Sequence, residues 1–212
     1  MAGLAEAFKE PFQCKGHPTL PVQDAKGGRY CFNCIIEAFQ NHIYNLTARM
    51  LDDRALAEDV TQEALVSAYR AFPRFRGDNL RAWLLRIAAN AARDILRIRK
   101  AHPSISIDQP IDDEDEESPG FDIPSRDESP EEHALRSELR RAIEDCLSKL
   151  PEGQKLAVTL VDVQGASYEE AAQTMDTSLG TVKSRLSRAR SALRDCLRVK
   201  GELLPSPFRQ DG

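Results

Sequence analysis

The stretch Ser167–Leu193, SYEEAAQTMDTSLGTVKSRLSRARSAL, decides the fold of the C-terminal part of this chain. Ser167, followed three residues later by Glu170, has the pattern of a capping box, so we expect a short helix to begin there. The DTSLG segment predicts a tight turn, with Thr177 or Ser178 capping a second helix. A short helix, a glycine-containing turn and a second helix together are typical of a helix-turn-helix.

The second of these helices is amphipathic. Its apolar residues recur at helical spacing, and its other face is basic. In a major groove the first turns of such a helix reach base edges, whereas later residues meet phosphates. We predict that the base-reading residues are Lys183, Ser184, Ser187 and Arg188. We predict phosphate contacts from Arg190, Arg194 and Arg198. The alternative is the solvated basic face of an ordinary helical bundle, but the capping box, turn and basic helix together favour DNA binding.

The charge of the chain is unevenly distributed. The formal net charge is -5, yet residues 101–132 alone carry twelve acidic side chains and one basic side chain. That segment is therefore at -11, and the rest of the chain is at +6. Low hydrophobicity with dense like charge predicts a segment that cannot bury itself. Because the excess negative charge is confined to this segment, the flanking parts have a net positive charge and can bind DNA.

Helical periodicity covers the chain on both sides of the acidic segment, and no strand-like alternation persists. Pro73 is expected to end one helix and Gly165 another. The expected fold class is all-α, with two small helical domains joined by a flexible acidic linker. The expected boundaries are an N-terminal extension at 1–28, a helical domain at 29–100, the linker at 101–130, the helix-turn-helix domain at 131–200 and a tail at 201–212.

Several classes of protein are excluded by what the sequence lacks. No apolar run approaches the roughly 20 residues of a transmembrane helix, so we expect no membrane insertion. The N-terminus lacks the basic start and apolar stretch of a secretory signal, so a cytoplasmic location is expected. The sequence shows no P-loop, nucleophile elbow or repeated carboxylate pair on one helical face, which argues against an enzyme.

Five cysteines do not suit a closed disulfide framework, and in a reducing cytosol we expect thiols or metal ligands. Cys14-x-x-His17, followed by Cys31-x-x-Cys34, predicts one structural zinc site. Two alternatives stay open. Cys31 and Cys34 can be small buried residues with Cys14 and His17 incidental, or a thiol switch can link Cys14 to Cys31 or Cys34.

The remaining cysteines, Cys146 and Cys196, lie on predicted helices of the C-terminal domain and are expected to be core residues. In the N-terminal domain, residues 75–100 mix basic side chains with Trp83, the single tryptophan. Aromatic and basic residues together suit melted DNA. We nevertheless expect Trp83 itself to be part of the core.

The segment LAEDVTQEALVSAYRAFPRFRGDNLRAWLLRIAANAARDILR, residues 56–97, resembles the second conserved-region domain of bacterial sigma factors. Within that family it is most similar to the extracytoplasmic-function (ECF) group, which keeps this domain and a C-terminal helix-turn-helix domain. The C-terminal helix-turn-helix domain of that group is similar to residues 150–193, LPEGQKLAVTLVDVQGASYEEAAQTMDTSLGTVKSRLSRARSAL. The resemblance covers roughly residues 31–100 and 131–198. It implies a specificity subunit that binds core RNA polymerase and promoter DNA, in a stress or signal response.

The resemblance also implies roles for individual residues. Asn90, in IAAN, would line the site of a flipped base of the -10 element, and Arg93 and Arg97 would hold its phosphates. The helix-turn-helix would read the -35 element. The polymerase-binding candidates, which lie outside the apolar stripe of their helix, are Asp59, Gln62, Glu63 and Arg70.

Two further expectations follow from the same resemblance. Residues 108–117 can mimic a polyanion in a polymerase channel, or can be a solvated spacer. An anti-sigma factor is a candidate partner. The alternative function is a free-standing helix-turn-helix regulator with a Cys/His sensory N-terminus.

Overall fold

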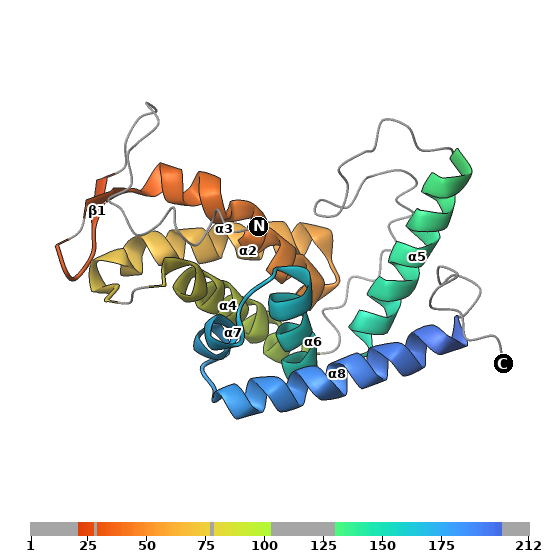
Figure 1. Cartoon of the computed structure of the whole chain (residues 1–212). Coiled ribbons are helices and arrows are strands. Elements are labelled where there is room, and N and C mark those ends of the chain that lie inside the picture. The colour runs from red at the N-terminus through yellow and green to blue at the C-terminus, as the bar shows by residue number, and fades with distance from the viewer. Residues whose placement is uncertain (1–20, 28, 77–78, 103–129, 201–212) are drawn as a thin grey trace.

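The computed structural model describes residues 21–27, 29–76, 79–102 and 130–200 (Figure 1). The acidic linker predicted at 101–130 lies almost entirely outside them, as do most of the N-terminal extension and the whole tail. The elements of the N-terminal domain are β1 (Pro21–Gln23), β2 (Arg29–Cys31), α2 (Phe32–Leu51), α3 (Arg54–Ala71), η1 (Phe72–Arg74) and α4 (Leu80–Ala101). Those of the C-terminal domain are α5 (Pro130–Ser148), α6 (Glu152–Val158), η3 (Thr159–Val163), α7 (Tyr168–Met175) and α8 (Leu179–Val199).

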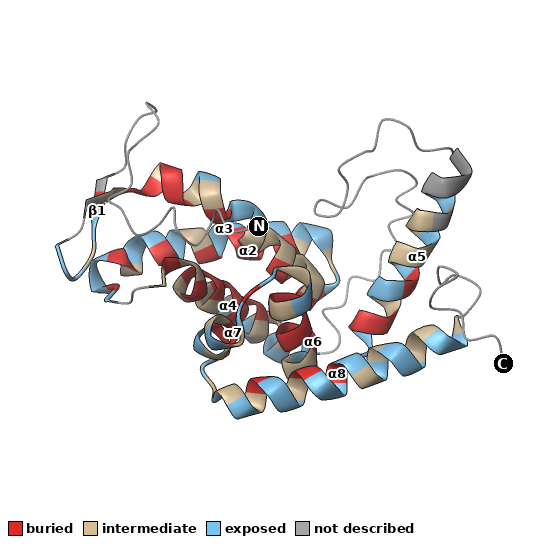
Figure 2. Ribbon diagram, in the orientation of Figure 1, coloured by how far each residue is buried: buried red, intermediate tan, exposed pale blue. Residues whose placement is uncertain are grey.

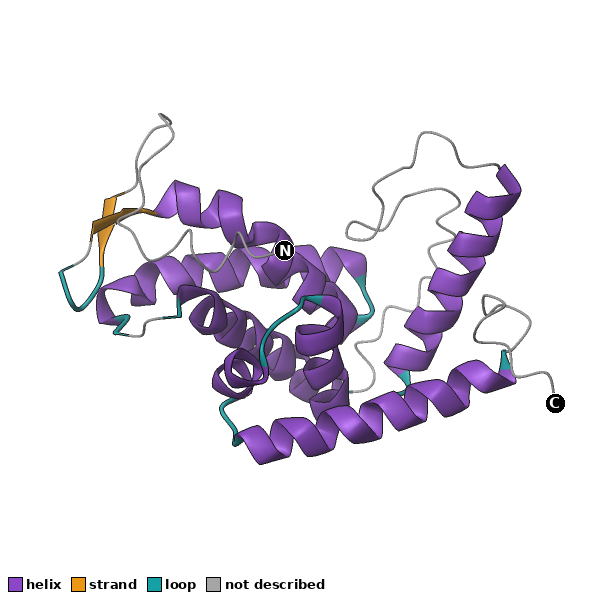
Figure 3. Ribbon diagram, in the orientation of Figure 1, coloured by secondary structure: helices purple, strands orange, loops and turns teal. Residues whose placement is uncertain are grey.

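The described residues are mainly helical, which confirms the predicted fold class, but a small antiparallel sheet precedes α2 (Figure 3). Val22 pairs with Tyr30 in this sheet, and Asp24 accepts a hydrogen bond from the Tyr30 hydroxyl at 3.2 Å. The prediction of no strands was therefore wrong at this point. Each strand has three residues, which is too short for alternation to be seen in the sequence.

The N-terminal core is formed where α2, α3 and α4 pack together. Asp53 caps α3 by accepting from the Leu56 N–H at 3.0 Å, and Asn79 caps α4 by accepting from the Ala82 N–H at 2.9 Å. Trp83 packs against Phe75, with a ring separation of 5.0 Å. The expected packing role of Trp83 is thus confirmed.

The helix-turn-helix forms as its caps predict. The Ser167 hydroxyl accepts from the Glu170 N–H at 3.1 Å, and the Glu170 carboxylate accepts from the Ser167 N–H at 2.9 Å, which completes the capping box. Ser178, rather than Thr177, caps α8. Gly165 has a φ of +66°, a conformation that suits glycine, and follows the π-helical segment η3.

The two domains pack against each other. One hydrophobic cluster contains Ile35 and Leu85 of the N-terminal domain together with Leu156, Leu160 and Val182 of the C-terminal domain. Helix α7 lies against α4, and α6 against α2 (Figure 1). A prediction of two domains linked only by a tether therefore underestimated their contact.

The structure also corrects the prediction for the C-terminal cysteines. Cys146 and Cys196 form a disulfide bond between α5 and α8, although Cys146 is buried as expected. No helix within the described ranges is long and apolar enough to cross a membrane.

Candidate nucleic-acid interface

The four predicted base-reading residues lie together on the outer face of α8. Lys183, Ser184, Ser187 and Arg188 are all exposed, whereas the opposite face buries Val182, Leu186 and Ala189. Figure 2 shows exposed and buried positions alternating along α8. The arrangement follows from the helical spacing in the sequence and leaves a polar, basic surface on the first turns of the helix.

Arg190, one of the residues predicted to contact phosphate, is hydrogen-bonded to a partner that the sequence analysis missed. Asp162 accepts two hydrogen bonds from Arg190, at 3.0 Å to Nε and 2.6 Å to Nη2. These hydrogen bonds raise the pKa of Arg190 above its ordinary value. Arg190 is therefore oriented within the domain, while Arg194 and Arg198 remain exposed further along α8.

The predicted -10 residues share one side of α4. Asn90 is exposed, and its Oδ1 accepts from Arg93 Nη1 at 3.1 Å. Arg97 lies one turn further on and pairs with Asp94 at 3.0 Å. Arg93 also donates from Nε to Glu152 of the C-terminal domain at 3.0 Å. A contact between Arg93 and DNA therefore requires that Arg93 leave Glu152.

A polar contact between the domains lies at the start of α4. Asn79 Nδ2 donates to Glu170 Oε1 at 2.9 Å, so the cap of α4 is bonded to the capping box of α7. Arg81 donates from Nη2 to the Gln164 carbonyl at 2.6 Å and lies 3.8 Å from Glu170. We call this contact, formed by Asn79, Arg81, Gln164 and Glu170, the α4–α7 latch. Arg86 and Asp176 form a further ion pair, at 2.7 Å, beside it.

The electrostatics of Glu170 favour the packed arrangement at neutral pH. Burial raises the pKa of Glu170, but the Asn79 amide, the Ser167 N–H and Arg81 together outweigh it and hold the pKa below its ordinary value. Because the pKa of Glu170 is lowered in the packed state, the ionised carboxylate stabilises that state at any pH above the ordinary carboxyl pKa. This stabilisation is lost as the pH falls through the lowered pKa.

A buried lysine makes a second contact between the domains. Lys155 of α6 is 5% exposed and donates from Nζ to Asp52, the left-handed residue that ends α2. Further along α2, Gln164 donates from Nε2 to the His42 carbonyl at 2.9 Å. Since a buried ammonium needs a partner, Lys155 ties α6 to the end of α2.

The predicted polymerase-binding residues are exposed on α3. Asp59, Gln62, Glu63 and Arg70 share a face, opposite the buried residues of the same helix. Val66, which is 47% exposed, lies among them at helical spacing, and Tyr69 is 41% exposed. Single exposed apolar side chains are normal on protein surfaces, so Val66 and Tyr69 by themselves do not mark a contact surface. The sequence analysis missed Val66, although its i, i+3, i+7 spacing from Glu63 and Asp59 could have indicated it.

The predicted zinc ligands are only partly covered by the structure. Cys14 and His17 lie outside the described residues. Cys31, at the end of β2, and Cys34, in the first turn of α2, are both buried. Among the described residues no cluster of three or more His, Cys, Asp or Glu side chains could hold a metal ion.

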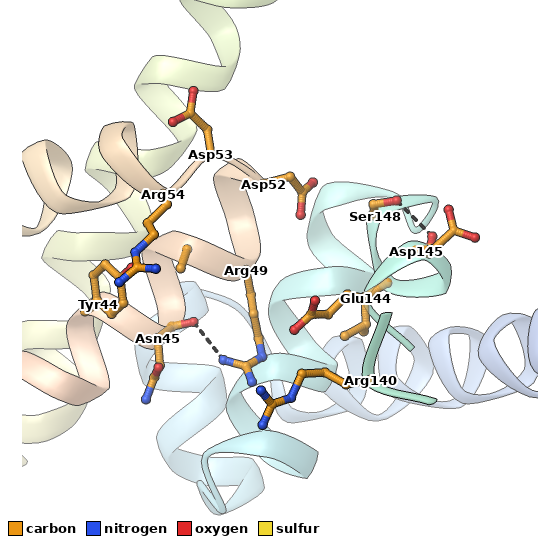
Figure 4. A pocket seen from close by; sticks show the side chains of 12 residues that line it. Tyr44, Asn45, Arg49, Asp52, Asp53, Arg54, Arg140, Glu144, Asp145 and Ser148 are labelled. Carbon is orange, nitrogen blue, oxygen red and sulfur yellow. Dashed lines mark hydrogen bonds between the residues drawn. The ribbon is translucent and has the colours of Figure 1, made fainter. Parts of the chain in front are cut away.

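A polar groove separates α2 from α5 (Figure 4). Arg49 projects into it from α2 and donates to the Asn45 carbonyl at 3.3 Å, while Arg140 and Glu144 approach from α5. Burial lowers the pKa of Arg49, Glu144 raises it and Arg140 lowers it further. Both domains thus contribute charged side chains to the groove.

Comparisons with known proteins agree with this geometry. The Sigma-70 region 2 family matches residues 35–102, and the Sigma-70, region 4 family matches residues 140–193. The RNA polymerase sigma-H factor of Pseudomonas aeruginosa is 38% identical over 170 residues, which cover 79% of this chain and 86% of that protein. The ECF RNA polymerase sigma-E factor of Escherichia coli (strain K12) is 38% identical over 169 residues, covering 79% and 87%.

Solved structures show the same architecture. The sigma factor RpoE of Bartonella quintana, in complex with the anti-sigma factor NepR, superimposes with a TM-score of 0.60 at 27% identity, covering 79% of this chain and 97% of that one. CnrH, in complex with the cytosolic domain of CnrY, gives a TM-score of 0.57 at 25% identity, covering 79% and 88%.

Two helical domains, one with an exposed helix-turn-helix and one with an exposed polar α4 face, define a bacterial transcription initiation factor of the two-domain type. The chain belongs to the ECF group of the sigma-70 family of RNA polymerase sigma factors.

Proposed function

We propose that this protein binds core RNA polymerase and directs it to promoters, as an ECF sigma factor in a stress or signal response. The observation that carries the proposal is the pair of exposed polar faces, on α8 and on α4, in a chain of this family. Membership of a family of non-enzymatic initiation factors supports a role without catalysis. It also disfavours the alternative of a free-standing regulator.

The division of work between the domains is part of the proposal. Residues 29–100 would bind polymerase through Asp59, Gln62, Glu63 and Arg70, and would open the -10 element with Asn90, Arg93 and Arg97. Residues 131–200 would read the -35 element through the exposed face of α8. The exposure of each of these side chains except the half-buried Arg93 supports the assignment.

The partners and location follow from the same reasoning. The solved relative RpoE is a complex with the anti-sigma factor NepR, and this supports a similar partner here. We also propose that the protein acts in the cytoplasm, where polymerase and promoter DNA are found.

Run-off transcription tests the function directly. Core polymerase with this protein should give discrete transcripts from its cognate promoter, and core polymerase alone should not. The variant Asp59→Ala/Gln62→Ala/Glu63→Ala, changed only at exposed positions of α3, should retain its fold but bind core polymerase more weakly. Absence of both core binding and stimulation by the wild-type chain would reject the proposal.

Replacing Arg188 with alanine should weaken -35 binding by about 1–3 kcal/mol, because a base-edge contact is lost. The loss should be concentrated at one base-pair position. Arg194→Ala, on the same helix, provides the comparison: a phosphate contact gives a uniform loss across sequences and a smaller salt dependence. Fluorescence anisotropy with single-position promoter variants measures both. Equal, sequence-independent effects of the two substitutions would contradict the assignment of Arg188 to base reading.

We further propose that Cys14, His17, Cys31 and Cys34 hold one structural zinc ion; otherwise no cofactor is proposed. The adjacency of Cys31 and Cys34 at the junction of β2 and α2 supports this pairing of ligands. Purified protein should contain about one zinc per chain, and Cys14→Ser should lower that content because a ligand is lost. Metal analysis by mass spectrometry measures it. A metal-free wild-type chain with unchanged stability would contradict the zinc site.

A further inference from the structure

The disulfide between Cys146 and Cys196 joins the two long helices of the -35 domain. Cys146 lies in the last turn of α5 and Cys196 near the end of α8, 50 residues later, with 5.9 Å between their Cα atoms. Cys146 is 1% exposed, whereas Cys196 is half-buried. One sulfur is thus carried by a residue that solvent reaches, and the other by a residue in the core.

The non-covalent contact that this bond reinforces is small. The buried residues of the second hydrophobic cluster are Leu147, Leu150, Val158, Leu186 and Ala189. Beside the disulfide, Asp145 accepts hydrogen bonds from Lys200 and, at 2.9 Å, from Lys149. These exposed ion pairs contribute little to stability in water. The covalent bond is therefore a large part of what holds α5 on α8.

Both helices belong to surfaces that the proposed function uses. Arg188, a proposed base reader, lies on α8 eight residues before Cys196, so the bond anchors the recognition helix about two turns away. On α5, Arg140 and Glu144 border the groove against α2 (Figure 4). The position of α5 therefore affects both the -35 domain and its contact with the N-terminal domain.

We propose that Cys146 and Cys196 form a reversible redox site, through which a hydroperoxide or a dithiol adjusts the stability of the -35 domain. This inference rests on the proposed cytoplasmic function, because disulfides in that compartment are usually transient or redox-sensing. In the disulfide form α5 is fixed on α8. In the dithiol form α5 is held on α8 without the covalent bond, through the small cluster and the Asp145–Lys200 ion pair.

The chemistry balances with hydrogen peroxide, the simplest hydroperoxide, as oxidant. The Cys196 thiolate attacks the peroxide, which breaks the O–O bond, gives a sulfenic acid at Cys196 and releases hydroxide. The Cys146 thiolate then attacks the sulfenic sulfur; the S–S bond forms, and the S–OH oxygen leaves as water after taking up a proton. Two thiols are oxidised, and one peroxide is reduced to two waters. A dithiol of the thioredoxin class reverses the step: its first thiolate attacks the Cys196 sulfur and Cys146 leaves as thiolate. Its second thiolate then attacks its own sulfur in the mixed disulfide, so Cys196 leaves as thiolate and the dithiol is oxidised to a disulfide.

The test maps thiols in the full-length wild-type chain. After treatment with hydrogen peroxide, peptide mass spectrometry should find a Cys146–Cys196 cross-linked peptide. After incubation with reduced thioredoxin, both cysteines should be alkylated, and a second peroxide treatment should restore the bond. The melting temperature should fall by about 5–15 °C on reduction, since the closed loop is long. Failure of the bond to form, or its persistence in thioredoxin, overturns the proposal.

Two variants locate the effect. Cys146→Ala/Cys196→Ala should show a melting temperature that no longer responds to peroxide, whereas Ser148→Ala, at an exposed position of α5 two residues from Cys146, should keep the response. If the Cys146→Ala/Cys196→Ala variant does not fold, thiol mapping in the wild-type chain still decides whether this disulfide forms and breaks reversibly. A peroxide response that persists in the Cys146→Ala/Cys196→Ala variant would overturn the assignment. Thiol mapping needs no polymerase, so a chain that fails in run-off transcription but cycles at Cys146 and Cys196 refutes only the proposed function.

Discussion

Replacing Leu156 with alanine is expected to lower the free energy of unfolding by about 2–5 kcal/mol, the range for removing a large buried aliphatic side chain. Leu156 is fully buried on α6 and belongs to the cluster that contains Ile35 and Leu85 of the N-terminal domain. Its truncation leaves a cavity where both domains meet. The loss should therefore affect the packing between the domains as well as α6 itself.

Urea denaturation followed by circular dichroism measures this change. Val199→Ala is the matched control, because Val199 is 88% exposed at the end of α8 and its truncation should change stability by less than about 0.5 kcal/mol. Equal stability of the Leu156→Ala variant and the wild-type chain would show that this cluster does not hold the domains together in solution.

Replacing Arg81 with glutamate is expected to open the contact between the domains, with a destabilisation of about 2–4 kcal/mol. The Arg81 side chain is 21% exposed beside Glu170, and its guanidinium donates to the Gln164 carbonyl at 2.6 Å. The substitution removes a charge-assisted hydrogen bond and places two carboxylates together at the α4–α7 latch. Arg93 should then leave Glu152 more readily, so this half-buried residue of the proposed -10 surface becomes accessible as Asn90 and Arg97 already are.

Small-angle X-ray scattering should show a larger radius of gyration for the Arg81→Glu variant at neutral pH. The control is Arg97→Glu, the same charge change on the same helix at a side chain that is 78% exposed. If both variants scatter like the wild-type chain, the latch does not hold the domains together.

The features of the candidate sites that could be predicted from the sequence are local ones. The capping box at Ser167 and Glu170, and the exposed face of α8, depend on residues three to four positions apart. Such neighbours are brought together by the helix itself. For the same reason the exposure of Asn90 and Asp59 follows from the apolar stripes of their helices. The roles of these residues in binding remain predictions.

The contacts that the sequence did not reveal join residues far apart in the chain. Arg93 reaches Glu152, which lies 59 positions away, and Lys155 reaches Asp52 across 103 positions. No periodicity links such pairs. In a sequence, a lysine next to a helix start is typically solvated, and only the packing of α6 on α2 makes Lys155 a buried partner.

By itself, then, the sequence determined the helices, their caps, the helix-turn-helix and the faces that meet solvent, since these depend on backbone hydrogen bonding and side-chain periodicity. The tertiary structure alone decided that the domains share a core and that Arg93 is held by Glu152. It also decided that Cys146 meets Cys196 in a disulfide. The physical reason is that long-range contacts arise from how apolar faces pack, and many packings are compatible with the same set of amphipathic helices.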